Sequence, residues 1–517
     1  MALKSRKIRV RFAPSPTGPL HIGGVRTALF NYLFARQYGG TFILRIEDTD
    51  SGRFVPGAEE YIIKALQWCG IRPDEGLTGA DAVAEQTDAA NPHAPYRQSQ
   101  RKALYRQYAE QLVQSGHAYY AFDTSESLDT LRKQAEEKKE TFTYNHAVRT
   151  QLQTSLTLPA DEVAHRLKTE KQWVVRFKMP ENREVTMHDL IRGEITVNTA
   201  TLDDKVLWKM TDELPTYHLA NIVDDHVMDI SHVIRGEEWL PSLPLHYLLY
   251  EAFGWTDTQP EFAHLSLLLK PDGKGKLSKR DGDRLGFPVF PLEWTDPKSG
   301  ELSRGYREDG YFPEAFINML ALLGWNPGTE QELFSLDELV SAFGLDRVVK
   351  SGAKFNPDKA KWFNQQYLRT KSNEELAQLY LPFLHERGVA TSAEYTAQVC
   401  GFIKERAAFV KDFWELSAYF FVAPTSYDPK AMEKHWKPET PNLMKQLASV
   451  LETVAPFTTE NIEQAVHQWI ERNQLNIGAV MNAFRLCVVG ASKGAGMFEI
   501  AVLLQKEEIL RRIRVLN

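Results

Sequence analysis

Residues 9–38 read RVRFAPSPTGPLHIGGVRTALFNYLFARQY and predict a strand, a glycine turn and a helix in succession. The alternating run at 9–12 is typical of a short buried strand. The following segment is rich in Pro and Gly, which disfavour regular structure. From Val25 onward the apolar residues recur at helical spacing. This order predicts the first βα unit of a nucleotide-binding sheet.

The turn in this stretch has the chemistry of an anion site. Gly23 and Gly24 carry no side chains, so a base or a phosphate could approach the backbone closely. A helix N-terminus offers free N–H groups, and His21 immediately precedes it as a donor to a phosphate oxygen. The GxGxxG and GxxxxGK[ST] fingerprints are absent here, which argues against a dehydrogenase and a P-loop ATPase. The alternative is an ordinary surface loop capped by glycines.

Composition indicates an ordinary globular protein of two to four domains. The chain has 517 residues, of which 43% are hydrophobic and 25% charged. The net charge of −7 argues against a general nucleic-acid binder, although local basic patches could still contact RNA. The basic start lacks an apolar signal region, and no run approaches the ~18 apolar residues of a membrane span. We therefore expect a cytoplasmic protein with no membrane partner.

Cysteine usage argues against a metal site. Cys69, Cys400 and Cys487 are far apart, and no CxxC pair or Cys/His cluster occurs. Few unpaired cysteines fit a reducing compartment. We expect no structural zinc.

Polar residues follow several predicted strands. Glu47 comes directly after the strand predicted at 41–46, at the sheet edge where ligands of open α/β sheets bind, and its carboxylate could hold an ammonium group. A solvated acidic loop is the alternative. Tyr217 and Asn221 are four residues apart and would share one helix face, or be ordinary polar residues at a core edge. Arg235 ends an apolar strand, where an arginine usually has an anionic partner, such as a structural Asp.

A basic, glycine-containing loop follows the apolar strand predicted at 265–269. It contains Lys270, Lys274, Lys276, Lys279 and Arg280 and is a plausible polyphosphate clamp, with a solvated basic loop as the alternative. Residues 281–310 are aromatic, Pro-rich and predicted to be irregular. From Phe312 onward the sequence predicts almost only helices.

Two segments resemble the signatures of class I aminoacyl-tRNA synthetases. Residues 21–24, HIGG, resemble HIGH, with Gly24 where the class often has His, and residues 276–280, KLSKR, resemble KMSKS. The longer string R-x-A-P-S-P-T-G-x-L-H-I-G-G resembles the glutamyl and glutaminyl branch. The helical C-terminal third is similar to bacterial-type glutamyl-tRNA synthetases rather than to glutaminyl relatives with β-barrels. The resemblance covers residues 7–370 strongly and the rest more weakly.

This resemblance implies an α/β fold with four parts. It implies a Rossmann-type parallel-sheet catalytic domain at 1–100 and 210–275, interrupted by an α+β acceptor-stem-binding insertion at 101–209. A stem-contact domain with the KLSKR loop would follow at 276–370, and an all-helical anticodon-binding domain at 371–517.

The implied activity is that of a glutamate–tRNA ligase. L-glutamate and ATP, with Mg²⁺, would form glutamyl-adenylate, and the glutamyl group would pass to the 3′ end of tRNA(Glu). A non-discriminating form that also charges tRNA(Gln), or an RNA-binding paralogue without catalysis, are the alternatives. A small nucleotidylyltransferase fits neither the length nor the tail. The family also suggests a monomer.

The resemblance assigns roles to residues that match the family's motifs. The catalytic residues would be His21, Lys276 and Lys279. ATP would contact these three together with Gly23, Gly24, Leu268 and Leu269. Glutamate would contact Arg11, Ala13, Ser15, Glu47, Tyr217, Asn221 and Arg235, with arginines near the carboxylates and Ala13, Ser15 and Glu47 near the ammonium. The tRNA would contact Lys359, Lys361, Trp362 and Arg406.

Overall fold

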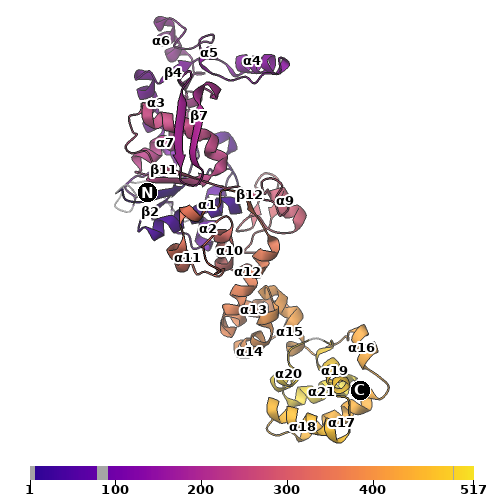
Figure 1. Cartoon of the computed structure of the whole chain (residues 1–517). Coiled ribbons are helices and arrows are strands. Elements are labelled where there is room, and N and C mark those ends of the chain that lie inside the picture. The colour runs from indigo at the N-terminus through magenta and orange to yellow at the C-terminus, as the bar shows by residue number, and fades with distance from the viewer. Residues whose placement is uncertain (1–5, 78–90, 493, 517) are drawn as a thin grey trace. The chain divides into compact units, whose positions relative to one another are not determined.

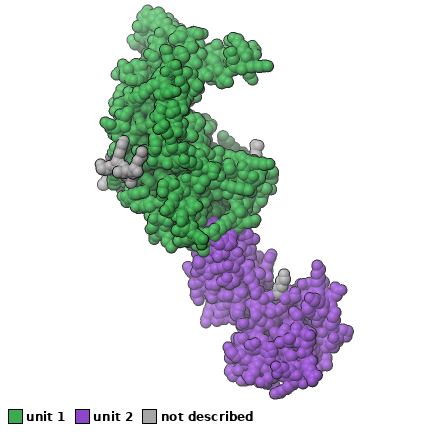
Figure 2. All heavy atoms as spheres, in the orientation of Figure 1, with its two compact units in different colours: residues 1–360 green, residues 361–517 purple. Residues whose placement is uncertain are grey.

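The computed structural model of this chain describes residues 6–77, 91–492 and 494–516. The chain forms two compact units, residues 1–360 and 361–517 (Figure 2). The sequence also predicts a polar loop at residues 73–97, of which residues 78–90 lie outside the described residues. No helix among the described residues is long and apolar enough to cross a membrane.

The first unit is built on a parallel sheet, as predicted. β1 (Arg9–Phe12), β2 (Thr41–Leu44) and β3 (Glu75–Gly76) pair in parallel in the order β1-β2-β3. The expected strand–turn–helix at 9–38 is confirmed, because β1 leads through the glycine turn into α1 (Ile22–Gln37). The helix α2 (Ala58–Trp68) connects β2 to β3. Both β1 and β2 are buried at every position, which explains their continuous apolar or charge-paired character.

The second half of the sheet comes from much later in the chain. β10 (His232–Gly236) and β11 (Glu261–Leu265) pair in parallel, and Ser231 N–H donates to Arg9 O at 2.8 Å, which places β10 beside β1. The connecting elements are α7 (Tyr217–Val227), the 3₁₀ helix η4 (Glu237–Ser242) and α8 (Leu243–Ala252). The carboxyl ends of β1 and β10 therefore lie together, with α1 beginning at the same edge.

In chain order an α+β insertion separates these two halves, and Figure 1 shows its helices α4, α5 and α6 at the end of the first unit away from β2. One antiparallel sheet has the order β4-β5-β8-β9, and a β6–β7 hairpin continues the main sheet from β11. Its elements are η2 (Gln98–Arg101), α3 (Lys102–Gln114), β4 (Ala118–Ala121), α4 (Ser125–Glu137), α5 (His146–Arg149), α6 (Ala160–Thr169), β5 (Val174–Phe177), β6 (Glu184–Asp189), β7 (Gly193–Asn198), η3 (Thr199–Thr201), β8 (Val206–Lys209) and β9 (Leu214–Pro215).

The buried carboxylate of Asp224, on α7, fastens the start of this insertion. It accepts hydrogen bonds from Gln98 Nε2 (2.9 Å), Arg101 Nε (2.9 Å) and Tyr105 Oη (2.8 Å). Its neighbour Asp225 instead binds Arg11 of β1 and Arg45, the residue that follows β2. Two consecutive residues of one helix thus hold the insertion and the main sheet.

The first unit ends with short strands and helices around the basic loop. The elements are β12 (Leu268–Leu269), α9 (Lys279–Leu285), β13 (Trp294–Thr295), β14 (Leu302–Ser303), α10 (Pro313–Leu322), α11 (Leu336–Ala342), η5 (Leu345–Arg347) and β15 (Ala353–Lys354). The prediction of an irregular segment at 281–310 was wrong for its first residues, which belong to α9, and for the antiparallel pair β13–β14. Ser278 N–H and Oγ–H both donate to Asp281, a Ser-x-x-Asp cap that begins α9.

The described part of the second unit is helical, as expected. α12 (Pro357–Thr370) begins in the first unit and continues into the second. The remaining elements are α13 (Asn373–Glu386), α14 (Ala393–Ile403), η6 (Lys404–Arg406), η7 (Val410–Asp412), α15 (Phe413–Phe421), α16 (Pro429–His435), α17 (Thr440–Thr453), α18 (Thr459–Arg472), α19 (Ile477–Val489), α20 (Met497–Leu504) and α21 (Lys506–Leu516).

Candidate active site

His21 caps α1 and has a defined tautomer. Its Nδ1 accepts the backbone N–H of Gly23 at 3.1 Å, so in the neutral ring the proton is on Nε2. Nε2 is buried and has no hydrogen-bond partner among the described residues. Burial lowers the pKa of His21 to about 4, and the positive charge of Lys276 adds to this effect. At neutral pH the ring therefore presents one N–H donor that no group of the described chain uses.

A cavity of about 450 Å³ lies at this helix N-terminus. Of the predicted ATP-binding residues it is lined by His21, Gly23, Gly24, Leu268 and Lys276. Leu269 is the next residue of β12 but does not line it. Glu238 also lines the cavity, with one carboxylate oxygen 3.7 Å from Lys276 Nζ. The cavity thus combines glycine backbone, a neutral N–H donor and a cation, which suits a nucleotide phosphate chain.

The basic loop contributes unequally to this site. Lys276 is exposed, with 60% of its side-chain surface accessible. Lys279 is the first residue of α9, and its side chain lies outside the described part of the structure. Lys270 pairs with Asp281 at 3.3 Å, within the same loop. The loop therefore brings at least one solvent-accessible cation to the cavity mouth.

The segment after α9 packs against the site. Val289 O accepts the N–H of Ile22 at 3.0 Å. The Phe290 ring packs edge-on against the His21 ring, with 6.1 Å between the ring centroids. Tyr61 Oη donates to Leu292 O at 2.5 Å. These contacts fix the first turn of α1 and bury His21, which is the physical cause of its lowered pKa.

A second cavity, of about 230 Å³, adjoins the first. The two share the lining residues Gly23, Gly24, Thr27, Gly236 and Glu238. The structure brings together here all seven residues expected to contact glutamate: Arg11, Ala13, Ser15, Glu47, Tyr217, Asn221 and Arg235. They come from the ends of β1, β2 and β10 and from the first turns of α7, so the sheet topology alone places them at one edge.

Arg235 is a buried charge of this second cavity that has no ion pair among the described residues. It is 4% exposed, and its Nη2 has no hydrogen-bond partner among the described residues. Its Nη1 donates to Tyr217 Oη (2.9 Å), and its Nε donates to His264 Nε2 (2.9 Å). Among the described residues no carboxylate pairs with it directly. The prediction that a structural Asp contacts Arg235 is therefore wrong.

Arg11, by contrast, is already paired. Its Nε and Nη2 bind the two oxygens of Asp225 at 2.9 and 3.0 Å, and Arg45 Nη1 binds the same carboxylate at 2.8 Å. Burial acts to raise the pKa of Asp225, but Arg11 and Arg45 outweigh it and hold the pKa below its usual value. The two cavity arginines therefore differ: one is neutralised within the fold, and one is not.

Glu47 is buried beside this network. Its Oε1 accepts from Arg45 Nη2 (3.1 Å) and Asn221 Nδ2 (3.2 Å), and among the described residues Oε2 accepts no hydrogen bond. Burial raises the pKa of Glu47, although Arg45 and Arg11 oppose the shift. The alternative interpretation, that Glu47 belongs to a solvated acidic loop, is therefore wrong.

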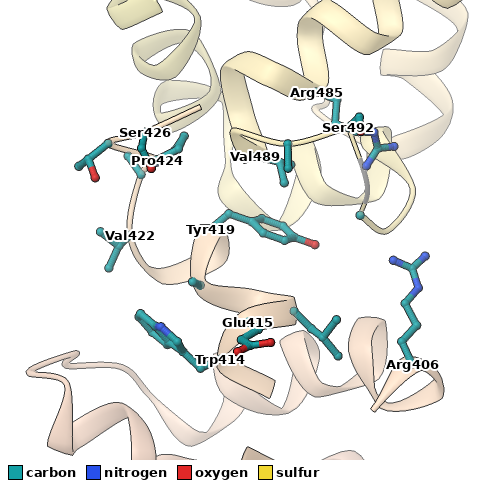
Figure 3. Close-up of a pocket in the computed structure, with 16 residues that line it drawn as sticks. Arg406, Trp414, Glu415, Tyr419, Val422, Pro424, Ser426, Arg485, Val489 and Ser492 are labelled. Atoms are coloured by element: carbon teal, nitrogen blue, oxygen red, sulfur yellow. The ribbon is translucent and has the colours of Figure 1, made fainter. Parts of the chain in front are cut away.

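The predicted tRNA-binding residues lie in two places. Lys359, Lys361 and Trp362 are on α12, where Lys359 Nζ pairs with Glu332 at 2.5 Å and Lys361 is exposed. Arg406 ends η6 and is exposed. It lines a cavity of about 860 Å³ inside the second unit (Figure 3).

This second-unit cavity combines aromatic and basic side chains. Trp414 and Tyr419 of α15 line it, and Arg485 of α19 faces it from the other side (Figure 3). Arg485 donates to Ala495 O at 2.8 Å. Such a combination suits stacked nucleobases and phosphates.

Sequence reasoning missed several residues of these sites. Glu238 lines both cavities, and its position just after β10 was the available signal. Arg45, Asp225 and His264 could not be identified, because their roles depend on contacts between distant segments. Arg485 also gave no signal. Among the described residues, no group of three or more His, Cys, Asp or Glu side chains could hold a metal ion.

Comparison with known proteins agrees with these features. Residues 7–362 match the family model of class I tRNA synthetases (E and Q), catalytic domain, and residues 375–516 match an anticodon binding domain. The chain is 59% identical to a glutamate–tRNA ligase of Phocaeicola vulgatus, with 99% of each chain covered. It is 56% identical to that of Porphyromonas gingivalis, over 99% of this chain and 98% of the relative.

Solved structures agree as well. A glutamate tRNA ligase from Elizabethkingia meningosepticum, in complex with its amino acid, superposes with a TM-score of 0.93 at 52% identity, covering 99% of both chains. The glutamate-tRNA synthetase of Elizabethkingia anophelis gives 0.91 at 51% identity, with the same coverage. The chain therefore belongs to the bacterial glutamate–tRNA ligases, within the class I family of glutamyl- and glutaminyl-tRNA synthetases.

Proposed function

We propose that this chain activates L-glutamate with ATP and transfers the glutamyl group to the 3′ end of tRNA(Glu). The observation that carries the proposal is the pair of adjoining cavities, one lined by all seven expected glutamate residues and the other by His21 and Lys276. An amino-acid carboxylate in the first would lie next to a phosphate chain in the second. That proximity is what adenylate formation requires.

In the first step a glutamate carboxylate oxygen attacks the α-phosphorus of ATP. A P–O bond to glutamate forms, the bond to the bridging oxygen breaks, and pyrophosphate leaves with the electron pair. His21 Nε2–H donates to a phosphate oxygen, and Lys276 and Lys279 neutralise the leaving pyrophosphate. ATP would carry Mg²⁺ as the counter-ion of its phosphates. The resulting mixed anhydride is then attacked by a ribose hydroxyl of the tRNA terminus, and AMP leaves.

Glutamate recognition follows from the unequal pairing of the cavity groups. Two groups bind a substrate carboxylate: the Nη2–H donors of Arg235 and the hydroxyl of Tyr217, whose oxygen accepts from Arg235 Nη1 and whose proton donates to the substrate. Where that carboxylate is the side-chain one, glutamine would leave the buried charge of Arg235 without an anion, which is the physical basis for rejecting it. Glu47 Oε2, the hydroxyl of Ser15 and the backbone carbonyl of Ala13 receive the ammonium group.

For the tRNA, we assign backbone contacts to Lys359, Lys361 and Trp362, and anticodon contacts to Arg406. The cavity beside Arg406 offers Trp414 and Tyr419 as stacking surfaces. Arg406→Ala is expected to raise the KM for tRNA severalfold at unchanged glutamate KM. Lys430→Ala, on α16 outside this cavity, is the matched control. The protein acts as a monomer in this scheme, which sedimentation equilibrium would check.

The test is glutamate-dependent ATP–pyrophosphate exchange with and without tRNA(Glu). Exchange that requires tRNA is the expected result, and absence of exchange in both conditions would favour the RNA-binding paralogue without catalysis. Charging assays on tRNA(Glu) and tRNA(Gln) then separate the discriminating form from the non-discriminating one. In the same assay His21→Ala is expected to lose exchange by about 10²–10³-fold, the usual effect of removing one transition-state donor.

A further inference from the structure

A buried relay connects Arg235 to a carboxylate that does not touch it. Asp189, at the end of β6, and His264, on β11, are each 0% exposed. His264 Nδ1 lies 2.6 Å from Asp189 Oδ2, and His264 Nε2 lies 2.9 Å from Arg235 Nε. The order Asp189–His264–Arg235 leads from the insertion hairpin to the glutamate cavity.

The hydrogen bonds fix the protonation of every member. A guanidinium can only donate, so His264 Nε2 accepts and the ring proton is on Nδ1, directed at Asp189. Asp189 remains ionised: burial acts to raise its pKa, but hydrogen bonds from His264 and the N–H groups of Arg192 and Ile191 lower it overall. Burial also lowers the pKa of His264, despite Asp189. The imidazole is therefore neutral and has one tautomer.

The neutral ring of His264 orients the Arg235 guanidinium without neutralising its charge. A carboxylate in direct contact would orient Arg235 but would also neutralise it, as Asp225 does for Arg11. His264 holds the Nε side and His246 Nδ1 lies 3.3 Å from Nη1, so two imidazoles and a tyrosine hydroxyl surround the cation. Nη2, which has no partner among the described residues, is left for a ligand.

We propose that Asp189 and His264 are a positioning pair that aims Arg235 at a carboxylate of glutamate while leaving its charge unpaired. This rests on the proposed function, because Arg235 is assigned there to the substrate. Neither residue touches the substrate in this scheme. Both act through the orientation of the guanidinium.

The decisive variant is Asp189→Asn. Both Asp189 oxygens already accept backbone N–H groups, from Ile191, Arg192 and His264. In the variant, the side-chain amide oxygen at position 189 would accept from those backbone donors, and the NH₂ group of the same amide would then face His264 Nδ1. His264 Nδ1 must then accept, so the ring proton moves to Nε2, where it faces the N–H of Arg235 Nε as a second donor. We expect the glutamate KM to rise tenfold or more, the usual effect of one lost charge-assisted hydrogen bond, with the ATP KM changed less than twofold.

Two further variants of the full-length protein make the test specific. His264→Gln can donate to Asp189 and accept from Arg235 in the same sense as the native ring, so it should raise the glutamate KM far less than His264→Leu. In ¹⁵N-histidine-labelled protein, the His264 resonances should show the Nδ1–H tautomer in the native chain and the Nε2–H tautomer in Asp189→Asn. This tautomer change would report the reversal of the His264 hydrogen bonds, independently of the glutamate KM.

Arg235→Lys separates the two possible failures. If Arg235→Lys leaves the glutamate KM unchanged, the proposed glutamate site itself is wrong. If it raises the KM while folded Asp189→Asn does not, the site stands and the positioning pair is overturned. If Asp189→Asn does not fold, equal KM values for His264→Gln and His264→Leu overturn the pair, and a clear difference supports it.

Discussion

Replacing Asp225 by Asn tests whether the buried ion network stabilises the catalytic unit. The carboxylate is 1% exposed and accepts three N–H groups, two from Arg11 and one from Arg45. Both guanidinium groups are at most 4% exposed. Arg45 keeps Glu47 as a partner, but Arg11 loses its only ion pair among the described residues. An uncompensated buried charge of this kind costs about 3–5 kcal/mol.

The measurement is native-state amide exchange of peptides covering β1 and α7. This reports the opening free energy of the unit that holds the network, independently of the helical unit. Asp129→Asn is the matched control, because that pair with Arg132 on α4 is more than half exposed and should contribute less than about 1 kcal/mol. If Asp225→Asn lowers the opening free energy by as little as the control variant does, the reasoning is refuted. Adding Arg11→Met should recover part of the loss, because it removes the unpaired charge.

Three other predictions concern stability. His232 is 4% exposed, and burial lowers its pKa to about 4. Between pH 4 and 6.5 the unfolded state therefore binds more protons than the folded state, and the free energy of unfolding falls as the pH falls through that window. His232→Phe should remove about 3 kcal/mol of this loss, measured by urea titrations at pH 7 and pH 4. Gly76→Ala should destabilise by at least about 2 kcal/mol in urea unfolding, because Gly76 has φ +101° and a Cβ there would meet Leu44 O at 2.0 Å. Tyr380→Phe should cost about 1 kcal/mol in the helical unit by amide exchange, because it removes the buried hydrogen bond to Ser417 (2.9 Å).

Much of the fold follows from local pattern. The 9–38 stretch encodes strand, turn and helix in its own spacing and turn residues, and the helical tail is periodic throughout. The placement of Glu47 and Arg235 at one sheet edge follows from their positions after strands, because parallel strands end together. The resemblance of two short signatures indicated the class, and the longer string around His21 together with the helical C-terminal third indicated the bacterial glutamyl branch.

What could not be predicted depends on partners distant in sequence. Arg11 and Arg235 look equivalent along the chain, yet one meets Asp225, 214 residues away, and the other meets His264. No local pattern distinguishes a neutralised arginine from an available one. The sequence predicts residues 281–310 to be irregular. The contacts that order residues 289–292 are made with α1 and Tyr61 and do not arise from the segment's own periodicity.

The pairing of Asp224 bears on how this architecture can be altered. Deleting residues 101–209 as a module would remove Arg101 and Tyr105 and leave a fully buried carboxylate with Gln98 as its remaining hydrogen-bond donor among the described residues. The insertion therefore cannot be removed independently of α7. Any variant that transfers or shortens the insertion must retain the hydrogen-bond donors of Asp224 or replace Asp224 with an apolar residue.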